Sequence, residues 1–170
     1  MKKGGSAMKV FLAAWGALSV IATQAMAGED SLRPEVIEWG ASAADIEKSL
    51  EGKCANGFVN RPIDPPFLQN VEDKQVQIDC DGLDFLGAPR WTEFVIGDDR
   101  LQMVWVMVDA EDRDTVLKAL QNAYGEPSHQ TDMFTAFVDH RAAWREEPPE
   151  VLFYSGELDA GMRSWFDNPN

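Results

Sequence analysis

The chain has 170 residues, of which 45% are hydrophobic, and its 29 acidic and 15 basic residues give a formal net charge of −14. That apolar content excludes a disordered chain, and the presence of only two cysteines excludes a disulfide-dense scaffold. The negative charge argues against nucleic acid or an anionic membrane surface as a partner.

The first 27 residues have the pattern of an export signal. Three lysines precede or begin an apolar run over residues 10–21, and Ala-Met-Ala at residues 25–27 supplies the small residues that a signal peptidase reads. The apolar run is shorter than the roughly 20 residues that cross a bilayer. We therefore predict a signal peptide over residues 1–27, with its start at Met1 or Met8. One secreted domain follows over residues 28–170, periplasmic or extracellular and without a membrane span.

A helix is the first predicted element of the mature chain. Ser42 and Asp45 have the spacing of a helix start, Ile46 and Leu50 share one face, and Gly52 is a suitable stop. The proline-rich run over residues 60–67 is predicted to be a surface loop. A half-buried strand follows over residues 75–81, and then a turn-rich stretch over residues 82–89.

Cys54 and Cys80 are the only cysteines, and an exported protein keeps disulfides. Their spacing is not that of a redox pair or of a zinc site. We predict that they form one bridge, which ties the end of the helix to the start of the sheet.

A hairpin is predicted next, over residues 91–96 and 101–108, and its second strand is apolar on both faces, as in a central strand. Asp109 and Asp112 indicate a second helix that ends at Gly125. Two further strands are predicted over residues 133–144 and 150–154, and a short helix over residues 158–166. The expected fold is α+β, an antiparallel sheet of about five strands in the order α-β-β-β-α-β-β-α. Two or three helices would pack mainly on one face.

Two features of the sequence are candidate sites of chemistry. His140 with nearby carboxylates is the basis for a small periplasmic hydrolase, although no catalytic motif is present. A calcium-stabilised structural protein is the other alternative, since calcium prefers oxygen ligands and carboxylates cluster in a turn-prone stretch at Asp79, Asp81 and Asp84. Their spacing is not that of an EF-hand, so solvated turn residues are the preferred interpretation. No cofactor is indicated.

The aromatic sheet face is the preferred candidate for a binding surface. A sheet covered on one face leaves the other to water, a loop or a partner, and exposed apolar faces often mark interaction sites. The candidate residues are Trp91, Met103, Trp105, Met107 and Trp144. We expect part of the face that carries Trp105 or Val104 to be covered by a partner, a dimer mate or the proline-rich loop.

These observations favour a non-catalytic secreted protein that binds, as an inhibitor-like or accessory protein of the envelope. The partner would be another envelope protein or a second copy of the chain. After leader removal 12 basic and 29 acidic residues remain, a charge of −17. This charge either steers a cationic partner or maintains solubility, and solubility is the preferred interpretation.

Overall fold

The computed structural model describes residue 1 and residues 32–169. Apart from Met1, the predicted export signal lies outside the described residues. The described part of the chain forms one antiparallel sheet with three α-helices, which confirms the α+β class. Among these residues, no helix has both the length and the apolarity that a membrane span needs.

The first half of the chain contains one helix and four strands. Ser42 caps the helix, because its Oγ accepts a hydrogen bond from the amide of Asp45 at 3.2 Å. The elements are α1 (Ala43–Leu50), β1 (Phe58–Ile63), β2 (Gln75–Phe85), β3 (Ala88–Gly97) and β4 (Arg100–Met107).

The second half repeats this layout and adds a helix at its end. Asp109 and Asp112 precede its first helix as predicted, yet neither caps it, since both carboxylates pair with Arg90 on β3. The elements are α2 (Arg113–Tyr124), β5 (His129–Gln130), β6 (Phe134–Phe137), β7 (Ala142–Arg145), β8 (Glu150–Tyr154) and α3 (Asp159–Asp167).

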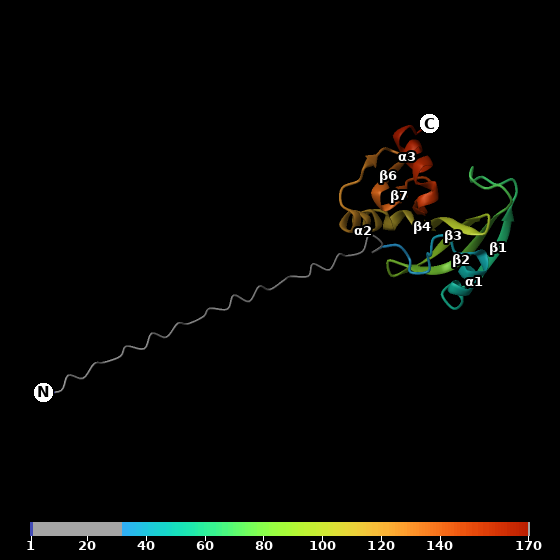
Figure 1. The fold of residues 1–170 in the computed structure, drawn as a ribbon, viewed down its shortest axis with the longest axis horizontal. Helices are drawn as coiled ribbons and strands as arrows, with labels where there is room; N and C mark the ends of the chain where they lie inside the picture. The colour runs from blue at the N-terminus through green and yellow to red at the C-terminus, as the bar shows by residue number, and fades with distance from the viewer. Residues whose placement is uncertain (2–31, 170) are drawn as a thin grey trace.

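The sheet has the strand order β1-β2-β3-β4-β8-β7-β6-β5. Each half is therefore a helix followed by four consecutive strands, and the last strands of the two halves, β4 and β8, pair at the centre. Figure 1 shows α1 beside the β1–β2 end of the molecule and α3 beside β6 and β7. The two halves show no convincing alignment of their residues, so the repetition is visible in the topology alone.

The predicted number and order of strands were wrong, because the sheet has eight strands. The proline-rich run contributes β1, which lies at the edge of the sheet, where a proline is tolerated. The strand predicted over residues 75–81 continues to Phe85 past a bulge between Cys80 and Leu83. The single strand predicted over residues 133–144 is two strands, separated by a 3₁₀ turn and by Arg141 at a φ of 50°.

Helices cover both faces of the sheet, so the expectation of helices mainly on one face holds for α1 and α2 only. α1 and α2 pack on the face that carries Phe94, Val104 and Phe153. α3 packs through Phe166 on the opposite face, here called the α3 face, which carries Val95, Met103 and Leu152. Both faces of β4 are therefore covered, which agrees with the prediction of a central strand from its apolar residues on both faces.

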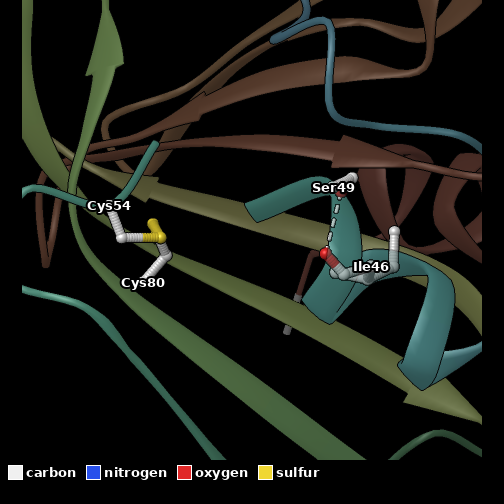
Figure 2. Close-up of a disulfide and its surroundings, with 4 residues drawn as sticks. All are labelled: Ile46, Ser49, Cys54 and Cys80. Carbon is white, nitrogen blue, oxygen red and sulfur yellow. Dashed lines mark hydrogen bonds between the residues drawn. A yellow bond between two sulfur atoms is a disulfide. The ribbon is translucent and has the colours of Figure 1, made fainter. Parts of the chain in front are cut away.

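The predicted disulfide is present between Cys54, just beyond α1, and Cys80 on β2, with their Cα atoms 5.5 Å apart. Figure 2 shows the bridge beside α1, where the hydroxyl of Ser49 donates a hydrogen bond to the carbonyl of Ile46 at 2.8 Å. Cys80 is fully buried and belongs to the core beneath α1. The bridge therefore joins helix and sheet, as its position in the sequence indicated.

Candidate functional site

Two segments cover the α3 face and leave a gap between them. One is α3 itself, and the other is the proline-rich loop of residues 64–74, here called the 64–74 loop, which packs through Leu68 against Val95 and Met103. Polar contacts hold this loop: the side-chain oxygen of Gln75 accepts from the amides of Phe67 and Leu68 at 3.1 and 3.0 Å. The loop thus covers part of the α3 face. Coverage by the proline-rich loop was one of the three alternatives predicted for the face that carries Trp105 or Val104.

The carboxylate of Asp98 anchors the far end of the 64–74 loop. It accepts hydrogen bonds from three consecutive backbone amides, those of Glu72, Asp73 and Lys74, at 2.8, 2.9 and 3.1 Å. These three bonds lower the pKa of Asp98, because they stabilise its charged form. The loop is fixed at both ends and frames one side of the gap.

The gap is a trough made of three adjoining hollows. The central hollow, about 270 Å³, lies over β4, β8 and β7 beside α3. It shares Met103 and Met162 with a hollow of about 360 Å³ between the 64–74 loop and α3. It shares Arg145 and Trp165 with a third hollow of about 250 Å³. The central hollow is lined by Met103, Trp105, Phe134, Ala143, Trp144, Arg145, Leu152, Met162, Trp165 and Phe166.

Four of the five residues predicted for the binding surface lie on the α3 face. Met103 and Trp105 border the central hollow, and Met107 follows them on the same face of β4. Trp91 lies on β3 with 42% of its surface exposed. Trp144 borders the same hollow but is fully buried, and its side chain belongs to the core on the opposite face.

Arg145 is the charged residue at the edge of the central hollow. Its guanidinium lies 4.6 Å from the centre of the Trp105 ring and forms an ion pair with Glu150. Glu150 faces Met107 across the β4–β8 pairing and is only 1% exposed. Burial raises the pKa of Glu150 to about 7, since the loss of water and the charge of Glu93 outweigh the attraction of Arg145.

The third hollow is acidic and lies where the β5–β6 and β7–β8 turns meet. The amide of Glu146 donates to the carbonyl of Met133 at 2.9 Å, which holds the two turns together. The lining residues are Asp132, Met133, Arg145, Glu146, Glu147 and Trp165. Glu146 is paired with Arg113 on α2, and this hydrogen-bonded pair lowers the pKa of Glu146.

Arg145, Met162 and Trp165 were not predicted from the sequence to be part of the site. One signal for Arg145 was available: a hairpin with a short turn places Arg145 opposite Glu150, on the same face and with opposite charge. Met162 and Trp165 are three residues apart, the spacing of one helix face. Which sheet face α3 covers is a non-local property that the spacing does not indicate.

The three aspartates of the calcium hypothesis are not gathered into a site. Asp79 accepts hydrogen bonds from Arg61 and Gln77, each at 2.7 Å. The bulge of β2 separates Asp79 from Asp84, which is exposed. Within residues 32–169, no three His, Cys, Asp or Glu side chains are placed to hold a metal ion.

His140, the residue of the hydrolase hypothesis, stacks on the ring of Tyr124 at 4.6 Å between centroids. Its Nδ1 is buried and has no hydrogen-bond partner among the described residues. The preceding residue, Asp139, is exposed and pairs with Arg163 on α3. The described residues therefore give His140 no carboxylate to orient it as a general base.

His129 lies between a carboxylate and a serine hydroxyl, as the histidine of a catalytic triad does, but the serine is not placed to act as a nucleophile. Its Nε2 lies 2.9 Å from the carboxylate of Asp167, and its Nδ1 lies 3.1 Å from the hydroxyl of Ser128. That hydroxyl donates to the carbonyl of Ala136 at 2.9 Å and accepts from the amide of Val138 at 3.2 Å. Because its proton is engaged by a backbone carbonyl, Ser128 fastens a turn and is not activated as a nucleophile.

Comparisons with models of protein families, with curated proteins and with solved structures found no match to this chain.

Proposed function

We propose that this protein acts by binding another protein of the cell envelope through the trough on the α3 face, as a non-catalytic accessory or inhibitor-like protein. The observation that carries the proposal is the central hollow, whose lining is apolar except for Arg145. Apolar hollows with few polar groups are the usual form of binding sites. The hydroxyl and imidazole groups described above lie outside this lining, so they give it no nucleophile or base.

Exposed aromatic side chains around the trough support a protein partner. Trp165 at one side of α3 is 42% exposed, and Phe67 on the 64–74 loop is 52% exposed. Both line hollows of the trough. Aromatic residues are enriched at protein interfaces and dominate their binding energy, because each covers a large area with little conformational entropy. The disulfide is consistent with an oxidising compartment, in which a partner would also be found.

Site-specific photo-crosslinking in whole cells tests this function. A benzophenone amino acid replaces Trp165 in the trough, and the matched control carries it at Lys48, an exposed position on α1. We expect one discrete adduct from position 165, none from position 48, and loss of the adduct when Trp105→Ala is added. Melting curves must show that the variants remain folded. Identical adducts from both positions, or none from position 165, would contradict the proposal.

A further inference from the structure

The trough combines an apolar hollow with an acidic one, and the two share a wall. Arg145 and Trp165 line both hollows, so two neighbouring side chains of one ligand reach them together. The central hollow, about 270 Å³, has room for a large apolar side chain. The acidic hollow, about 250 Å³, is lined by the indole of Trp165 and by carboxylates. An indole face and carboxylates both attract a cation.

Two carboxylates of the acidic hollow are uncompensated. Asp132 and Glu147 are exposed and have no ion-pair or hydrogen-bond partner among the described residues. In contrast, Glu146 is paired with Arg113, and Arg145 is paired with Glu150. The hollow therefore presents net negative charge to an incoming group.

The charge of the whole chain argues against a second copy as the occupant. With 29 acidic and 15 basic residues, two copies repel each other, and an acidic partner is repelled in the same way. A cationic partner is attracted at long range and then held at close range by the acidic hollow. The bulk charge and the local charge thus select the same class of ligand.

Building on the proposed function, we infer that the trough binds a polypeptide segment of a cationic partner that presents an apolar side chain beside a basic one. The apolar side chain occupies the central hollow against Met103 and Trp105. The Lys or Arg side chain occupies the acidic hollow, over the indole of Trp165 and near Asp132 and Glu147. The apolar contact supplies most of the affinity, and the carboxylates select the basic neighbour.

Nuclear magnetic resonance with short peptides tests this inference, because the tryptophan indole signals report on separate places. Trp105 and Trp165 line the central hollow, whereas Trp39 packs with the core on the opposite face and serves as the internal control. The probes are acetyl-Phe-Ala-Arg-amide, its Gln and Glu analogues at the third position, and acetyl-Ala-Ala-Arg-amide. We expect acetyl-Phe-Ala-Arg-amide to shift the indole signals of Trp105 and Trp165 in a saturable way. Its affinity should be higher than that of each of the other three peptides.

A pair of charge variants separates the role of the carboxylates from the role of the trough. Asp132→Asn with Glu147→Gln should weaken binding of the Phe-Ala-Arg peptide about two- to thirtyfold, the range for two exposed ion pairs, and leave binding of the Gln analogue unchanged. The matched control, Glu111→Gln with Glu126→Gln, neutralises two exposed carboxylates elsewhere and should change neither affinity.

The outcomes distinguish the two proposals. Equal binding of the Arg, Gln and Glu peptides at the trough overturns the charge selection and leaves the binding function standing. Trough signals that no peptide shifts, or that shift with protein concentration as the chain dimerises, overturn the inference. In either case the crosslinking experiment decides independently whether the trough binds a protein partner.

Discussion

The buried carboxylate of Glu150 should make the free energy of unfolding depend on pH. Its folded pKa of about 7 lies above the usual value of 4.5, so the folded protein binds a proton that the unfolded chain has already lost. This proton stabilises the fold fully below pH 4.5, and the stabilisation disappears as the pH rises through 7. A shift of this size corresponds to about 3.4 kcal/mol in total, of which about 3 kcal/mol is lost between pH 4.5 and pH 8.

The variant Glu150→Gln keeps the shape of the side chain and an oxygen that accepts from Arg145, but it cannot ionise. We expect its free energy of unfolding, relative to wild type, to rise by about 3 kcal/mol between pH 4.5 and pH 8. Other titrating groups act equally in both proteins, so the difference isolates Glu150. Urea unfolding at five pH values, followed by tryptophan fluorescence, measures it.

The control is Glu126→Gln, an exposed carboxylate just beyond α2, whose difference from wild type should stay flat over the same pH range. If the curves of wild type and Glu150→Gln run parallel from pH 4.5 to pH 8, burial does not govern this carboxylate. If wild type gains stability relative to the variant as the pH rises, the ion pair with Arg145 dominates, and the reasoning is refuted.

Two further predictions concern the frame of the trough and the disulfide. Gln75→Leu leaves the amides of Phe67 and Leu68 without their acceptor, so we expect a loss of about 1–3 kcal/mol and faster hydrogen exchange in the 64–74 loop. Unchanged exchange there would show that Gln75 does not hold the loop. Replacing both Cys54 and Cys80 with alanine should lower the free energy of unfolding by about 3.5 kcal/mol, from the loop entropy that a separation of 26 residues implies. Guanidinium titration measures this loss, and a midpoint equal to that of the oxidised protein would contradict the prediction.

Local signals predicted the elements that have clear ends. The helix α2 follows Asp109 and ends at Gly125, whose φ of 82° requires a residue without a side chain. The hairpin of β3 and β4 was also predicted, from two apolar runs joined by a polar turn. In these cases a few adjacent residues decide the structure, and the sequence displays them directly.

The elements that were missed depend on distant partners. β1 exists because residues 58–63 pair with β2, and its one proline, Pro62, is tolerated because that edge of the sheet is free. Alternation placed Met103 and Trp105 on one face, but Ala142, Ala143 and Trp144 are apolar on both faces, so their register was ambiguous. The trough itself forms where α3 and the 64–74 loop meet the sheet, and no local pattern indicates that meeting.

The pairing of β4 with β8 has a consequence for folding during synthesis of the chain. β4 ends at Met107, whereas β8, which pairs with it, begins only at Glu150, near the end of the chain. Until β8 has been synthesised, β4 is an edge strand whose backbone N–H and C=O groups on one side have no partner. Exposed strand edges of this kind promote aggregation. A stop codon between Met107 and Glu150 should therefore yield insoluble material, even though the first half has its own helix, its own four-strand meander and the disulfide.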